Sequence, residues 1–394
     1  MLRVRLRTKE PVCLSMDQAA TSQRRTLPFL TGSAVRGALV ERYMRPGGKP
    51  ATRDFAELFL SDHISFGNLY PVDQRITTWS DPLPFSAVTC KRYPGFYDPQ
   101  FDPTHEERHG VRDVLLQSLV KEPGSCDEGG CQAELTVQGG FFGKDRAGSY
   151  NGVKLRHEIS ARTAIEAERE IALSQNLYSL ETIAGGQEFV GFMSVPGRED
   201  DLGRDLLKKG GTLRIGTAKT RATGAVEVAT PPTTEEAGHR WGTLEERLKE
   251  FRKAARRILH DDKAGPGGVA PDCLFCITLR SDTILLDRFL RHCPALNARL
   301  LEDRLKAPAN SFQMIWAFSN CRWAGGWNAA QRLPKETELA ISMGSVFLFT
   351  TTLADDQLLG LLQKLEREGC GERTQEGFGE VVICHPFHCE GVKL

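Results

Sequence analysis

The feature that most constrains the fold is a glycine-rich segment near the end of the chain. Residues 369–383 read GCGERTQEGFGEVVI, with four glycines in the first eleven positions. Glycine tolerates positive φ and lets other groups approach the backbone closely, so a tight loop is expected here. An apolar helical pattern at 356–366 precedes the loop and a β-branched run at 381–383 follows it, which predicts the order helix, loop, strand.

A weaker copy of this segment occurs earlier in the chain. Residues 208–228 again combine glycines and basic residues and run into a valine-rich strand. A repeated pattern of this kind indicates a duplicated unit. We therefore predict an α+β fold of two tandem ferredoxin-like units, each of β-α-β-β-α-β order. The expected divisions are 1–230 for the first unit, 231–268 for a linker and connecting helix, and 269–394 for the second unit.

The amino-acid composition limits the classes of partner that the protein can bind. The 394 residues include 51 Lys plus Arg and 51 Asp plus Glu, so nucleic-acid binding has to come from local basic clusters. No apolar run approaches a membrane span and no N-terminal stretch is typical of a signal peptide, which predicts a cytoplasmic protein without a membrane partner. The eleven cysteines, an odd number in a long chain, favour free thiols or a metal site over a disulfide framework.

Several segments carry the residue types of a phosphate-binding surface. Residues 204–224 hold six basic residues and one acidic residue, and a helix expected to begin at Thr31 presents its positive end. The small residues of that helix start equally fit close packing against a sheet, and solvated surface is an alternative for each isolated charge. The predicted RNA-binding residues are Ser33, Arg36, His157, Arg162, Lys219, Arg221, Arg373, Gly377, Phe378 and Gly379.

Residues 85–135 are interpreted as an insertion in the first unit. Cys126 and Cys131 form a C-x4-C pair, with Cys90 before it and His109 between. The segment is rich in Gly and Pro, and a structural zinc would supply the ordering energy that its few apolar residues cannot. We predict a zinc site with these four ligands, against the alternative of isolated thiols on a flexible loop.

Two other residue pairs are interpreted as structural. Cys273 and Cys276 have metal-ligand spacing but lie in an apolar strand, where residues three apart point to opposite faces. Trp323 and Trp327 offer rings on which bases can stack, but tryptophan is more often part of a core, and we favour the core interpretation.

Three sets of residues resemble signatures of a known superfamily. Residues 28–39, PFLTGSAVRGAL, resemble the P-x-I-P-G-S-S-L-R-G helix start of the RAMP superfamily of CRISPR effector proteins, and the two glycine loops resemble its G-rich loop. Residues 176–191 resemble a further RAMP segment, L-Y-x-x-E-x-I-x-x-G-x-x-F-x-G. With the tandem arrangement, the cysteine insertion and residues 323–347, the chain is most similar to the Csx-ten-type, Cas-five-like subunit of type III-D complexes.

This resemblance implies a non-catalytic structural subunit of a type III CRISPR ribonucleoprotein that acts in antiviral defence. Such a subunit binds the five-prime repeat tag of the crRNA and contacts the large subunit and the backbone RAMP subunits, and meets target RNA indirectly. The residues themselves show no H-E-x-x-H, no Walker loop and no clustered carboxylate pair. Both considerations favour binding over catalysis.

Other functions remain open at this stage. A backbone-type RAMP subunit that cleaves target RNA would use a loop carboxylate, for which Asp17 is the candidate. A guide-processing endoribonuclease would need a general base, for which His157 or His63 is the candidate. A generic single-strand RNA-binding module, outside CRISPR, is the third alternative.

Overall fold

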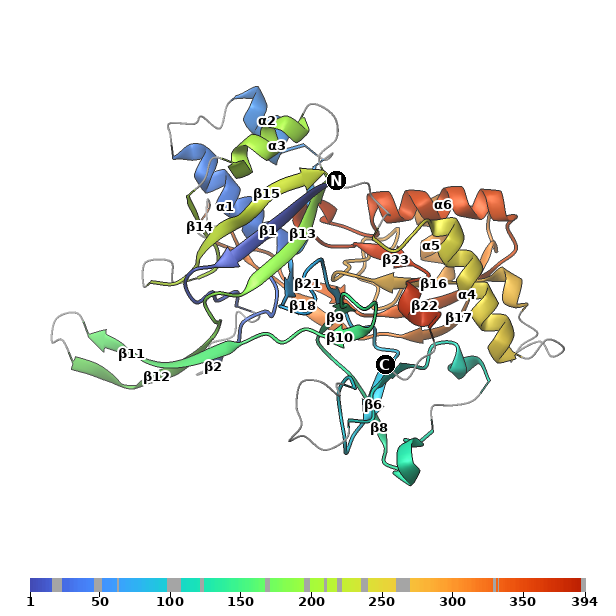
Figure 1. Ribbon diagram of the computed structural model, residues 1–394. Coiled ribbons are helices and arrows are strands. Elements are labelled where there is room, and N and C mark those ends of the chain that lie inside the picture. Colours follow the sequence, from blue (N-terminus) through green and yellow to red (C-terminus); the bar gives the residue numbers. More distant parts are fainter. Residues whose placement is uncertain are drawn as a thin grey trace.

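A computed structural model gives the fold (Figure 1). Among the described residues no helix is long and apolar enough to cross a membrane. The described residues are 1–15, 23–45, 52–61, 64–97, 108–120, 124–166, 171–194, 199–208, 211–217, 222–234, 240–259, 270–328, 331 and 333–390.

The first unit is organised around its N-terminal strand. Its antiparallel sheet has the order β14-β15-β1-β13-β3, with β4 also paired to β13, and its elements follow one another as β-α-β-β-α-β. The burial of β1 alternates, because Leu2, Val4 and Leu6 face the core while the arginines between them face outward. The elements are β1 (Leu2–Thr8), α1 (Gly32–Met44), α2 (Arg53–Phe59), β3 (Ser65–Phe66), β4 (Tyr70–Val72), β13 (Glu188–Ser194), α3 (Glu199–Lys208), β14 (Thr212–Arg214) and β15 (Ala225–Thr234).

The second unit repeats this arrangement. Its antiparallel sheet has the order β17-β22-β16-β23, so its first strand is again central, flanked by its third and fourth strands. The predicted helix at 356–366 is confirmed within α6, whose apolar stripe faces the core. The elements are β16 (Leu274–Leu279), α5 (Ala298–Leu305), β17 (Phe312–Phe318), β18 (Cys321–Ala324), β19 (Trp327–Asn328), β20 (Leu333–Pro334), β21 (Glu338–Ile341), β22 (Val346–Thr351), α6 (Asp355–Glu368) and β23 (Val381–Ile383).

Each unit has its own hydrophobic core. One core contains the apolar residues of β1, α1 and β13, and the other contains those of β16, β22 and α6. Helix α4 (Leu244–Leu259), which the sequence presents as a connector, buries one face in the second core. Its Arg247 also forms a bidentate ion pair with Glu366 of α6 at 2.8 Å. Helix α4 is therefore packed as part of the second unit.

A long excursion separates β4 from β13. It contains the predicted insertion at 85–135 and a long hairpin, β11 (His157–Glu166) with β12 (Ile171–Ile183), that projects from the body in Figure 1. Leu115, Leu116 and Leu119 of the insertion join the second core, so this segment packs on the second unit. The remaining strands are β2 (Gln23–Arg24), β5 (Asp81–Pro82), β6 (Ala87–Cys90), β7 (Val111–Asp113), β8 (Leu135–Val137), β9 (Phe141–Lys144) and β10 (Tyr150–Gly152).

A buried arginine joins the two units. Arg280, directly after β16, forms ion pairs with Asp81 and with Glu380, the latter at 2.6 Å, and its carbonyl accepts a hydrogen bond from Tyr70 of β4. Burial alone would raise the pKa of Asp81, but Arg280 and His385 outweigh it and hold that pKa well below its usual value. The charges are thus compensated within the joint between the units.

Candidate nucleic-acid interface and metal site

The first glycine loop lies between β14 and β15 and folds against the segment that follows β1. The N–H of Thr217 donates to the carbonyl of Cys13 at 2.9 Å, and the N–H of Ile215 donates to the carbonyl of Gly224 at 2.8 Å. Gly216 and Gly224 have φ of +91° and +90°. Both glycines are therefore in a conformation that other residues rarely adopt.

The second glycine loop repeats these bonds one for one. The N–H of Glu372 donates to the carbonyl of Ile284 at 2.9 Å, and the N–H of Cys370 donates to the carbonyl of Gly379 at 2.8 Å. Gly371 and Gly379 stand eight positions apart, as Gly216 and Gly224 do, and also have positive φ. The described ends of the two loops therefore have the same spacing and the same backbone bonds.

Close backbone approach explains why these positions are glycines. A Cβ on Gly216 would lie 2.2 Å from the carbonyl oxygen of Cys13, and one on Gly371 would lie 2.2 Å from that of Ile284. A Cβ on Gly379 would lie 2.0 Å from the oxygen of Cys370. The predicted RNA-binding glycine Gly379 thus has a structural reason that is independent of RNA.

The second loop also joins the two units. Gly377 lies against Asn68 of the first unit, because a Cβ there would be 2.7 Å from the Asn68 Oδ1. That same oxygen accepts a hydrogen bond of 2.9 Å from the N–H of Gly32, at the start of α1. The structure therefore brings the predicted α1 site and the predicted second loop together. Asn68 is not among the predicted site residues, because no local pattern in the sequence distinguishes it.

The charge of Arg373 is neutralised inside the protein. Its guanidinium pairs with Glu338 at 2.6 Å and with Glu376 at 2.8 Å, and it lies 4.8 Å from the ring centre of Phe378. Burial alone would lower the pKa of Arg373, but the two carboxylates raise it. Phe378 is partly buried against the second unit. The pair is built into the loop rather than displayed on it.

The remaining predicted RNA-binding residues lie in different settings. Ser33 lies 3.3 Å from the N-cap hydroxyl of Thr31, and the Arg36 guanidinium donates to the carbonyl of Phe59. His157 is exposed at the start of the projecting hairpin. The side chain of Arg162 and the residues Asp17, His63, Lys219 and Arg221 lie outside what the structure describes.

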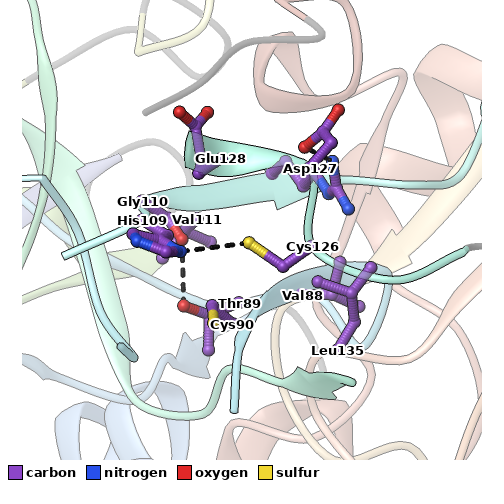
Figure 2. Close-up of a pocket in the computed structure, with 11 residues that line it drawn as sticks. Val88, Thr89, Cys90, His109, Gly110, Val111, Cys126, Asp127, Glu128 and Leu135 are labelled. Carbon is purple, nitrogen blue, oxygen red and sulfur yellow. Dashed lines mark hydrogen bonds and ion pairs between the residues drawn. The ribbon is translucent and has the colours of Figure 1, made fainter. Parts of the chain in front are cut away.

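The four predicted metal ligands do come together. Cys90 ends β6, His109 precedes β7, and Cys126 and Cys131 flank a short turn, yet their ligand atoms all lie within 4.8 Å of one another. Figure 2 shows Cys126 and His109 pointing toward each other above the strand that carries Cys90, and the Sγ–Nδ1 distance is 3.1 Å. The insertion sheet, of order β7-β6-β8, holds this cluster.

The spacing of the cluster suits a tetrahedral metal. The Sγ atoms of Cys90 and Cys131 are 3.8 Å apart, which is about the edge of a tetrahedron built on zinc–sulfur bonds of about 2.3 Å and is too long for a disulfide. Burial opposes ionisation of Cys90, but N–H groups of Tyr93 and Arg92 outweigh it and lower the pKa of that thiol. Burial raises the pKa of Cys126. The residues present could hold a metal ion.

Two aromatic predictions differ from the structure. Trp323 on β18 and Trp327 on β19 are 66% and 61% exposed, so the favoured core interpretation is wrong. Both lie on two-stranded hairpins that are separate from the main sheet, and in the part of the chain that the structure describes no second layer covers them. Cys276 is buried in β16, as predicted, whereas Cys273 lies in the short turn before the strand and is partly exposed, so the prediction that both cysteines lie in the strand holds for Cys276 only.

Comparisons with known proteins give distant likenesses only. No protein-family model matches the sequence, and no curated protein matches it. A structure of the type III-B Cmr-beta complex bound to cognate target RNA contains a chain with 13% identity and a TM-score of 0.43, covering 93% of this chain and 95% of that one. A Cas6 product complex matches at 15% identity and a TM-score of 0.29, covering 51% and 80%. Thermus thermophilus Cas6 matches at 12% identity and 0.24, covering 57% and 78%.

Proposed function

We propose that this chain is a tandem RAMP protein, with two ferredoxin-like domains, that binds guide RNA as a non-catalytic subunit of a type III CRISPR effector complex. The observation that carries the proposal is the duplicated glycine loop. Each copy occupies the same place in a β-α-β-β-α-β unit and uses the same backbone bonds. This is the feature in which the sequence resembles the superfamily.

The proposed RNA contacts are centred on the first unit. There the glycine loop carries Lys219 and Arg221, and its neighbourhood is rich in basic residues. Arg24 lies 5.8 Å from the ring centre of Tyr178, where β2 meets the long hairpin β11–β12. Cations and aromatic rings in one region suit a single-stranded nucleic acid. The type III-D, Csx-ten-type assignment and capture of the five-prime repeat tag belong to this proposal and rest on the sequence resemblance.

The metal in the insertion is proposed to be a structural zinc. Three thiolates and one imidazole are the donor set typical of closed zinc sites, and all four positions are filled by protein. The insertion packs on the second unit through Leu115, Leu116 and Leu119, so a metal that orders it would also stabilise that contact.

The alternative function is an endoribonuclease, either of target RNA or of the guide precursor. The exposed position of His157 on the hairpin leaves it accessible to RNA. Single-turnover assays on repeat RNA without added metal, and on target RNA with the assembled complex, separate these enzymes from a binding subunit. Product whose formation is abolished by His157→Ala or Asp17→Ala would overturn the non-catalytic assignment.

The proposal is tested by RNA binding and by composition of the complex. The protein would be expressed with its neighbouring genes and a CRISPR array, and the copies per complex counted by native mass spectrometry. Binding of a labelled repeat-tag RNA should weaken at least tenfold in Lys219→Ala/Arg221→Ala, because two phosphate contacts are lost. The matched control is Lys249→Ala/Arg257→Ala on the exposed face of α4, which removes the same charge. Equal affinities of both double variants would refute the first glycine loop as an RNA site.

A further inference from the structure

The connection after the central strand of each unit contains another repeated feature. In the first unit Cys13 anchors the glycine loop. Directly beyond it, the N–H of Leu27 donates to the carbonyl of Leu14 at 2.8 Å. Ser15 and Thr26 then pair as an isolated antiparallel bridge. These two pairings bring the outgoing and returning parts of the chain together beside the glycine loop. We call this paired segment, Leu14 and Ser15 with Thr26 and Leu27, the neck.

The second unit has the same neck. Ile284 anchors its glycine loop, and the N–H of Cys293 donates to the carbonyl of Leu285 at 2.8 Å. Leu286 and His292 pair as an isolated antiparallel bridge, at the positions that correspond to the first-unit bridge. In this copy the residues between the two sides of the neck, together with His292 of the bridge, form a short tip, residues 287–292, that the structure describes completely.

The tip is held rigidly by one carboxylate. Asp287 Oδ1 accepts hydrogen bonds from the N–H groups of Phe289 at 2.8 Å and Arg291 at 3.0 Å, and Oδ2 accepts from the Arg291 Nε at 2.9 Å. Leu290 is kept at a φ of +60°, a conformation that costs a non-glycine residue free energy. The turn thus fixes the direction of its side chains before any partner arrives.

The tip displays apolar groups beside cations. Phe289 and Leu290 are 63% and 79% exposed. The guanidinium carbons of Arg288 and Arg291 lie 4.8 Å and 5.2 Å from the centre of the Phe289 ring. Two arginines against the single carboxylate of Asp287 leave a positive surface around an aromatic ring, and this combination matches an unstacked base and its phosphate.

We propose that the tip formed by residues 287–292 is a stacking site for a base of single-stranded RNA, with Arg288 placed to bind the adjoining phosphate. The second glycine loop cannot supply this charge, because Arg373 is paired with two carboxylates of its own surroundings. The tip follows shortly after Ile284 in the chain, and the carbonyl of Ile284 accepts the hydrogen bond that holds the second glycine loop. This inference rests on the proposed RNA-binding function and specifies where the second unit contacts the RNA.

The test compares exposed aromatic residues on the two units. Affinity for a short labelled single-stranded RNA that carries the repeat tag would be measured by fluorescence anisotropy with the full chain. Phe289→Ala should weaken binding about fivefold or more, and Phe289→Trp should retain it. Tyr97→Ala removes an aromatic ring that is 58% exposed in the insertion and should leave binding unchanged. Arg288→Ala should reduce the slope of log affinity against log salt by about 0.7.

The outcomes separate this inference from the function on which it rests. If the wild-type protein binds no single-stranded RNA, the proposed function fails. If the wild type binds and Phe289→Ala behaves like Tyr97→Ala, RNA binding stands and the stacking site is refuted. If Phe289→Ala leaves RNA affinity intact but lowers incorporation into the effector complex, the tip contacts a protein subunit and the proposal is overturned.

Discussion

The close contact at Gly371 predicts a large loss of stability on adding one methyl group. At a φ of +90° an alanine costs about 1–2 kcal/mol in backbone strain. Its Cβ would lie 2.2 Å from the Ile284 carbonyl, so this carbonyl has to move and the hydrogen bond from Glu372 is lost, at a further cost of about 1–3 kcal/mol. The two contributions reach about 2–5 kcal/mol, a large part of the stability of one domain.

Differential scanning calorimetry gives the measurement. Gly371→Ala should lower the melting temperature by about 5 °C or more, and Gly216→Ala should act similarly, since its Cβ meets Cys13 at the same 2.2 Å. The matched control is Gly360→Ala within α6, where a Cβ meets nothing within 4 Å and a better helix former should preserve or raise stability. Equal melting temperatures for Gly371→Ala and Gly360→Ala would refute the close-packed loop and the structural account of its glycines.

Two further predictions concern the metal site and the joint between the units. Cys126→Ser should abolish stoichiometric zinc in elemental analysis and lower the melting temperature of the purified protein, whereas Cys293→Ser, outside the cluster, should do neither; a Cys126→Ser protein with full zinc content would exclude the proposed ligand set. Because the pKa of Asp81 is held below its usual value, its stabilising contribution is complete above the unfolded pKa of about 3.9 and is lost as pH falls toward the folded value. Asp81→Asn should therefore remove most of that acid dependence in denaturant titrations between about pH 5 and pH 3 and lower stability at neutral pH, and an unchanged pH profile would contradict the assignment.

The sequence supports the local parts of this structure well. The helix, the glycine loop and the strand at 356–383 follow from composition and periodicity, because propensity and φ requirements act within a few residues. The cluster of three cysteines and one histidine could also be predicted from the sequence, because such residues in a segment with few apolar residues have few other structural roles. Contacts between residues of the two different units could not be predicted from the sequence. Asn68 meets Gly377 only where the two units are in contact, and nothing near either residue in the sequence encodes that contact.

Exposure was the other property that the sequence did not determine. Trp323 and Trp327 have the composition of core residues, but their hairpins lie outside the layers that could bury them. Arg373 shows the converse case, because a basic residue in a glycine loop suggests a phosphate until its carboxylate partners are seen. Whether a charge or a ring is available to a partner depends on the neighbours that the tertiary structure brings to it.

The two units share the backbone bonds of their glycine loops, but the surfaces around the loops differ. This suggests that the two units have different roles. Both glycine loops are held by the same backbone hydrogen bonds. The second loop is packed into the other unit through Gly377, and its arginine, Arg373, is neutralised internally by two carboxylates. The ion pairs of Arg373 with Glu338 and Glu376 leave its guanidinium less available to a phosphate. We therefore expect RNA contacts at the first loop and at the rigid Phe289 tip, while the second loop fixes the angle between the two units.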